Sequence, residues 1–139
     1  MSRRRLLVRI SVAQLAAGLA GLTVALRRGR NYDVGFLRGR PENIGWDAIL
    51  QGTAYSAPVP MLAVQAWATR NLAAGPDDGA RRILGVLGAV MVPGYLLERY
   101  GRAHLRPSGF DPVETPVVVV SVGLAAAMAV LGHQAATGR

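Results

Sequence analysis

The chain has 139 residues, a formal net charge of +8 and no cysteine, so disulfides, thiolate metal sites and thiol nucleophiles are excluded. Hydrophobic residues make up 51% of the chain and charged residues only 17%, a composition that argues against disorder and excludes a coiled coil or collagen. The length fits a single domain.

Four stretches with almost no charge lie between arginine-rich clusters, at residues 6–26, 44–68, 83–97 and 115–136. A hydrocarbon core about 30 Å thick is crossed by roughly 20 residues of α-helix. Three stretches reach that length, and the 15-residue stretch 83–97 is flanked by arginines that can snorkel to the interface. The sequence therefore predicts an all-α integral membrane protein, a four-helix transmembrane bundle with short loops forming one domain over residues 1–139.

Two other interpretations of these stretches fit less well. A soluble helical bundle would need polar faces at helical spacing, and the stretches lack them. The start of the chain, Ser2 to Leu7, resembles a twin-arginine export signal. The apolar run that follows has 21 residues, however, and is longer than the apolar region of a signal peptide. We interpret it as the first span.

Four spans place the N-terminus, the 69–82 connection and the C-terminus on one side of the membrane. Each side then carries eight arginines, so the positive-inside rule does not decide the orientation. The first helix favours a cytoplasmic N-terminus. Six of the eight carboxylates lie on the opposite side, where they could form a polar mouth: Asp33, Glu42, Asp47, Glu98, Asp111 and Glu114.

Three of these carboxylates, Glu98, Asp47 and Glu114, are the predicted catalytic acids or bases. Glu114 also fits a structural role, because Asp111 and Pro112 before it form a capping arrangement for the fourth span. Low dielectric near a membrane raises the pKa of a carboxylate, which suits general acid catalysis near neutral pH.

The end of the third span carries Tyr95, Glu98, Arg99 and Arg102 at the spacing of one helical face. This pattern predicts either a site with Glu98 as its acid or an interfacial anchor in which Glu98 pairs with Arg102.

The second span carries a polar stripe at steps of three and four residues, typical of one helical face. The stripe consists of Asp47, Gln51, Tyr55, Pro58, Leu62 and Gln65. Pro58 and Pro60 remove two backbone donors and should kink or interrupt this helix, as in helices that line cavities. The polar residues could equally join helices by hydrogen bonds. The predicted ligand-binding residues are Gln14, Gln51, Tyr55, Gln65, Tyr95 and Arg99.

Small residues four apart, such as Ala17 with Gly21 and Gly123 with Ala127, predict close packing within the bundle or between copies in a homo-oligomer. His104 and His133 fall on opposite sides, so no metal site is expected. No phosphate loop or dinucleotide fingerprint is present, and we expect no cofactor. Beside membrane spans, the arginine clusters favour lipid headgroups over nucleic acid.

Three functions are compatible with this pattern. The first is a membrane-embedded polar-lined site for a lipophilic small molecule, with acid–base isomerase or cyclase chemistry if it is an enzyme acting on a lipid or isoprenoid-like substrate. The alternatives are an accessory or structural subunit of a membrane complex, and a small channel or exporter of dual topology. Arginine without lysine, with abundant alanine, glycine and valine, indicates a GC-rich bacterial gene and hence a bacterial cytoplasmic membrane.

Overall fold

The computed structural model describes residues 1–31, 33–34, 37–38 and 40–134. These residues form a mostly helical fold with a short antiparallel ribbon, which confirms the predicted helical class. Its elements are α1 (Arg3–Arg28), β1 (Asp33–Val34), β2 (Leu37–Arg38), η1 (Pro41–Asn43), α2 (Ile44–Leu50), α3 (Val59–Ala74), α4 (Asp78–Leu97), α5 (Arg99–His104), η2 (Pro107–Gly109) and α6 (Glu114–His133).

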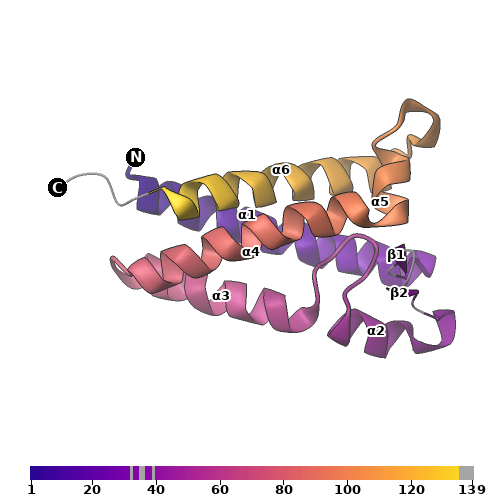
Figure 1. Ribbon diagram of the computed structural model, residues 1–139, viewed down its shortest axis with the longest axis horizontal. Helices are drawn as coiled ribbons and strands as arrows, with labels where there is room; N and C mark the ends of the chain where they lie inside the picture. Colours follow the sequence, from indigo (N-terminus) through magenta and orange to yellow (C-terminus); the bar gives the residue numbers. More distant parts are fainter. Residues whose placement is uncertain (32, 35–36, 39, 135–139) are drawn as a thin grey trace.

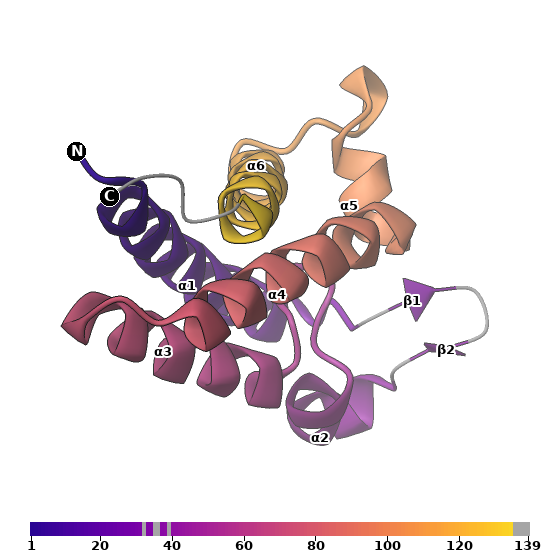
Figure 2. The ribbon, with the colours of Figure 1, turned by 60° about the vertical axis from the view of Figure 1, so that its left-hand side comes forward.

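The four longer helices α1, α3, α4 and α6 run along the long axis of the molecule (Figure 1). The most extensive packing is between α4 and α6, while α1 packs on both α6 and α3 (Figure 2). The start of α1, the turn between α3 and α4 and the end of α6 lie at one end, and α2, α5 and the ribbon lie at the other. This is the arrangement of ends that the predicted spans require.

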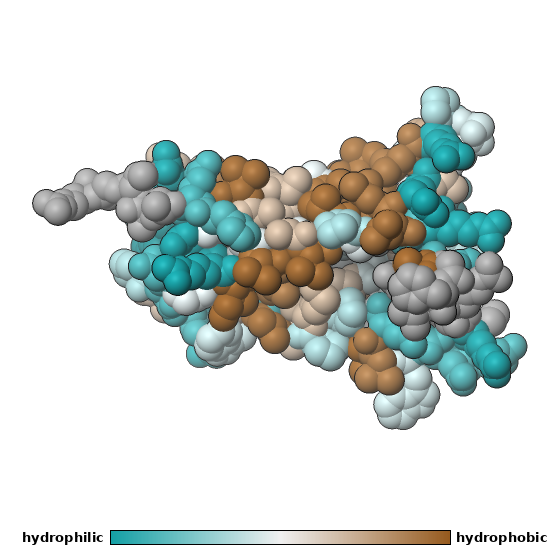
Figure 3. Space-filling model, in the orientation of Figure 1, coloured by the Kyte–Doolittle hydropathy of each residue, from teal (hydrophilic) through white to brown (hydrophobic). Residues whose placement is uncertain are grey.

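Three helices are long and apolar enough to cross a membrane: α1 with 26 residues, and α4 and α6 with 20 each. Their outward faces carry exposed apolar side chains, among them Val12, Leu19, Val86, Val90, Val119 and Val130. On the face shown in Figure 3, hydrophobic side chains gather over the middle of the molecule and hydrophilic ones at both ends. These features are consistent with a multi-pass membrane protein.

Polar side chains, by contrast, are buried between the helices. The Ser11 hydroxyl of α1 lies 2.7 Å from the Thr69 hydroxyl of α3, and Gln65 donates to the Ser11 carbonyl at 3.2 Å. All three residues are buried. Apolar residues outside and hydrogen-bonded polar residues inside are typical of helices packed within a lipid environment.

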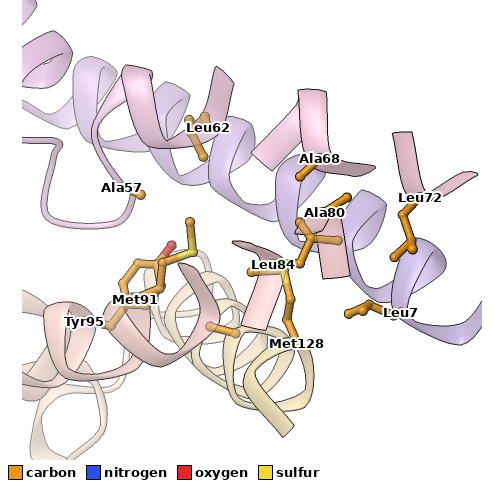
Figure 4. Packing of buried hydrophobic residues seen from close by; sticks show 11 residues of the cluster. Leu7, Ala57, Leu62, Ala68, Leu72, Ala80, Leu84, Met91, Tyr95 and Met128 are labelled. Carbon is orange, nitrogen blue, oxygen red and sulfur yellow. The ribbon is translucent and has the colours of Figure 1, made fainter. Parts of the chain in front are cut away.

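The apolar part of the core is contributed by all four longer helices (Figure 4). Leu7, Leu62, Leu84 and Met128 belong to one buried cluster. The helices approach closely where side chains are small. A Cβ on Gly88 of α4 would lie only 2.5 Å from the Ala125 carbonyl oxygen of α6, so this contact requires glycine.

Residues 44–68, expected as one span, do not form one continuous helix. α2 ends at Leu50 and α3 begins at Val59, so the stripe from Asp47 to Gln65 is not a single helical face. Gly52 has a φ of 85°, which ends α2 in a conformation that favours glycine. The predicted interruption at Pro58 and Pro60 is confirmed, because both lie at the start of α3, where a missing N–H is tolerated.

The other boundaries differ less. α4 begins at Asp78, earlier than the predicted 83–97, because the Asp77 carboxylate accepts the Ala80 N–H at 2.9 Å and caps the helix. α6 ends at His133, and residues 135 and 136 of the predicted fourth span lie outside the described residues.

Candidate functional site

A cavity of about 180 Å³ lies between the 51–58 loop, the start of α3 and the C-terminal half of α4. Val90, one of the residues that line it, is 52% exposed on the apolar outer face of α4. Its lining consists of Gln51, Thr53, Ala54, Ser56, Ala57, Pro58, Met61, Val90, Met91, Gly94, Tyr95 and Glu98.

The cavity wall is mainly apolar, with a few polar groups. Gln51 places its side-chain oxygen in a buried position, and within the described part of the chain that oxygen has no hydrogen-bond partner. The Tyr95 hydroxyl accepts a hydrogen bond from Gln14 of α1 at 3.3 Å. An apolar cavity with a few oriented polar groups is the usual form of a small-molecule site.

Glu98, between α4 and α5, is only 1% exposed. One carboxylate oxygen accepts the Gly101 N–H at 2.5 Å and caps α5, and the other accepts the Asp33 N–H at 3.4 Å. Burial raises the pKa of Glu98 above its ordinary value, although these backbone N–H groups oppose the shift.

The predicted single face from Tyr95 to Arg102 is broken, because α4 ends at Leu97 and α5 starts in a new direction after Glu98. Arg99 extends away, with 69% of its side chain exposed, and lies 3.7 Å from the Asp33 carboxylate. Among the described residues, the Glu98–Arg102 ion pair does not form; the Glu98 carboxylate faces backbone N–H groups.

A second buried carboxylate, Glu114, lies at the start of α6 with none of its side chain exposed. Oε1 lies 2.8 Å from an Nη of Arg28 and 3.4 Å from Nε of Arg30. Oε2 accepts the Tyr55 hydroxyl at 2.5 Å and lies 2.5 Å from Nε2 of His104. We call these five residues the Glu114 cluster.

The cluster joins separate parts of the fold. His104 of α5 also places Nδ1 2.7 Å from the Gly109 carbonyl oxygen, so both ring nitrogens face acceptors. Tyr55 connects the 51–58 loop to α6 through its hydroxyl, and its side chain is fully buried. The backbone of Tyr55 in turn rests against Gly21 of α1, where a Cβ would collide with the Tyr55 carbonyl.

The capping arrangement before α6 is confirmed for Asp111. Its carboxylate accepts the Val113 and Glu114 N–H groups at 2.8 Å each, which lowers the pKa of Asp111 to about 2. Thr115 accepts the Asp111 N–H at 2.9 Å, the bond that a capping-box glutamate would otherwise make. The Glu114 side chain is thereby left to turn inward.

Of the predicted site residues, Gln51, Tyr95 and Glu98 meet at the cavity, and Gln14 contacts Tyr95. The remaining ones lie elsewhere: Tyr55 and Glu114 in the Glu114 cluster, Gln65 in the α1–α3 interface, Arg99 on the surface, and Asp47 on α2, where it accepts the Arg40 N–H at 2.9 Å.

Some residues of the cavity and of the Glu114 cluster were not predicted from the sequence. They are Met61 and Met91 in the cavity wall, and Arg28, Arg30 and His104 beside Glu114. Arg28 and Glu114 are 86 positions apart, and no local spacing connects them. The described residues contain no group of three histidine or acidic side chains that could hold a metal ion.

These features define a class: a mostly helical protein with membrane-length apolar helices, buried polar contacts and a mainly apolar cavity between its helices. No protein-family model, curated protein or solved structure matches the chain. Its function is therefore inferred from its own residues.

Proposed function

We propose that this protein is a four-helix transmembrane bundle that binds a lipophilic small molecule in the cavity between the 51–58 loop, α3 and α4. The position of the cavity carries the proposal. One of its lining residues, Val90, lies on the apolar outer face, and its wall includes Gln51 and the buried Glu98. A molecule dissolved in the hydrocarbon could therefore enter from the side and place its polar end against these groups.

The proposed fourth crossing is α3. Its 16 residues give a length of about 24 Å, short of a hydrocarbon core of about 30 Å. The preceding residues 52–57 are all buried. Irregular backbone is tolerated at membrane depth where protein covers it, so this buried loop can complete the crossing.

The size of the cavity limits what can enter it. An apolar cavity of about 150 Å³ holds one benzene ring. A cavity of about 180 Å³ can therefore take the polar end and a ring-sized part of a ligand, while the rest extends past Val90 into lipid.

Any acid–base chemistry on such a ligand would depend on Glu98. It is the one predicted catalytic carboxylate that lines the cavity, and its raised pKa suits a general acid. Asp47 and Glu114 make their contacts elsewhere. The arginine-rich, lysine-free composition supports a bacterial cytoplasmic membrane as the location.

The test uses two valines one turn apart on the outer face of α4. Val86 and Val90 are 53% and 52% exposed, but only Val90 lines the cavity. Binding of dodecanol, dodecylamine and dodecanoate is measured with protein in phosphatidylcholine nanodiscs, against empty nanodiscs. We expect saturable binding of at least one amphiphile, weakened about tenfold by Val90→Trp and unchanged by Val86→Trp.

If Val86→Trp weakens amphiphile binding as much as Val90→Trp does, the amphiphile binds outside the cavity. Absence of saturable binding by the wild-type protein would refute the proposal and favour the accessory-subunit or channel alternatives.

A further inference from the structure

The two most deeply buried glutamates differ in the charges around them. Glu114 is fully buried, yet Arg28 and Arg30 contact one of its oxygens and His104 contacts the other. Glu98 is 1% exposed, and in the described part of the chain it forms no ion pair. Its contacts are neutral backbone N–H groups, from Gly101 and Asp33.

Burying an ionised carboxylate without a cation is unfavourable, so such a group either takes up a proton or acquires a positive partner. The nearest arginine in the sequence, Arg99, lies against Asp33 and is mostly exposed. Among the described residues, Glu114 therefore has countercharges and Glu98 has none, which leaves Glu98 available to a cation of a ligand.

A second group in the same cavity has the same hydrogen-bonding preference. The Gln51 side-chain oxygen is buried and, among the residues described, unpartnered. A carboxylate keeps spare acceptor capacity after two hydrogen bonds, since each oxygen has two lone pairs. Gln51 and Glu98 both line the cavity, whose mainly apolar wall includes Met61 and Met91.

We propose that the polar end of the ligand is a cationic hydrogen-bond donor, a primary or secondary ammonium on a lipophilic body, bound by Glu98 and Gln51. This inference rests on the proposed function, because it specifies the chemistry of the same cavity. The ammonium N–H groups donate to the Glu98 carboxylate and the Gln51 oxygen, and the apolar body contacts the methionines and extends toward Val90.

The experiment compares four probes of equal chain length in phosphatidylcholine nanodiscs: dodecylamine in its ammonium form, dodecyltrimethylammonium, dodecanol and dodecanoate. For each probe, binding in the cavity is taken as the part of the binding signal that is lost in the Val90→Trp variant. We expect dodecylammonium to bind about tenfold more tightly than dodecanol, because a charged donor makes the stronger hydrogen bond to a carboxylate. Dodecyltrimethylammonium has the charge but no N–H and should bind more weakly than dodecylammonium. Dodecanoate should bind most weakly.

Two variants assign the preference to residues. Glu98→Gln removes the charge at nearly constant volume and should abolish the difference between dodecylammonium and dodecanol, whereas Glu42→Gln, at an exposed position, should preserve it. Gln51→Leu removes only the neutral acceptor and should weaken dodecylammonium and dodecanol alike. If Glu98→Gln does not fold, Gln51→Leu still tests whether the polar end of the probe binds at Gln51 in the cavity.

The outcomes separate the two proposals. Equal affinity for dodecylammonium and dodecanol, or a preference for dodecanoate, would overturn the ammonium inference while cavity binding itself stood. Binding of none of the four probes would overturn the proposed function and the inference together. An ammonium preference that survives Glu98→Gln, or affinities that Gln51→Leu leaves unchanged, would also contradict the assignment.

Discussion

At the scale of single residues, Glu114 has a role that its position in the sequence does not indicate. In the sequence it belongs to a helix-capping pattern, and the cap does form, but through Asp111 and Thr115. Glu114 is therefore free to turn inward and pair with Arg28 and Arg30, at and just beyond the end of α1. Its contacts join the α1 end, the 51–58 loop, α5 and α6.

Neutralising Glu114 should accordingly destabilise the fold. Glu114→Gln keeps the shape but leaves two arginines without their shared carboxylate. Breaking a fully buried ion pair costs roughly 3–5 kcal/mol; because the Arg28 and Arg30 side chains are 38% and 36% exposed, we expect a loss of about 2 kcal/mol. Thermal unfolding in detergent measures the change in Tm, with the exposed Glu42→Gln as control. An unchanged Tm would mean that the cluster does not stabilise the protein.

At the scale of elements, the contact between α4 and α6 depends on glycine. Gly85 and Gly88 of α4 face Gly132 and the Ala125 carbonyl of α6 at distances that leave no room for a Cβ. The spacing of small residues predicted close packing, but a glycine on a helix can face a neighbour or the surroundings. Gly123 of α6 belongs to the same kind of pattern, yet a Cβ there would meet no atom of another helix within 4 Å in the described part of the chain.

The two kinds of glycine should respond oppositely to alanine. Gly88→Ala forces α4 and α6 apart and should lower the free energy of unfolding by about 1–3 kcal/mol. Gly123→Ala meets open space and should raise it by roughly 0.5–1 kcal/mol, because alanine stabilises a helix relative to glycine. Chemical unfolding monitored by helical circular dichroism compares them. Destabilisation by Gly123→Ala would indicate that this face packs against a second copy or another protein.

The elements also show where local rules succeed. The helix starts at Pro58 and Asp77 follow from residue chemistry and can be predicted within a few residues. The break between α4 and α5 at Glu98 could not be predicted, because the sequence around it continues a helical pattern. The chain turns there because the Glu98 carboxylate is buried against backbone N–H groups of α5 and β1.

At the scale of the whole molecule, the charges at its two ends bear on its orientation in the membrane. The ends carry similar numbers of arginines, and the first helix favours a cytoplasmic N-terminus. Because the chain has no cysteine, single introduced cysteines can report the side of each end. Ser2 precedes α1 and Ser108 belongs to η2 between α5 and α6; both are exposed. The start of α1 and the connection from α5 to α6 lie at opposite ends of the molecule.

With a membrane-impermeant maleimide applied to intact cells, we expect Ser108→Cys to be labelled and Ser2→Cys to be labelled only after permeabilisation. The reverse labelling pattern would indicate that the N-terminus lies outside the cytoplasm. Labelling of both residues in intact cells would support the dual-topology alternative.

The sequence by itself determined the helical class, the apolar runs of membrane length and the proline interruption before α3, because these depend on composition and on neighbours within a few residues. It also identified Gln51, Tyr95 and Glu98 as site candidates. Only the tertiary structure decided that these three share a cavity, and that, in the part of the chain described, arginines pair with Glu114 and not with Glu98. Charge pairing in a buried site depends on distances between residues far apart in the chain, such as Arg28 and Glu114, which no local pattern encodes.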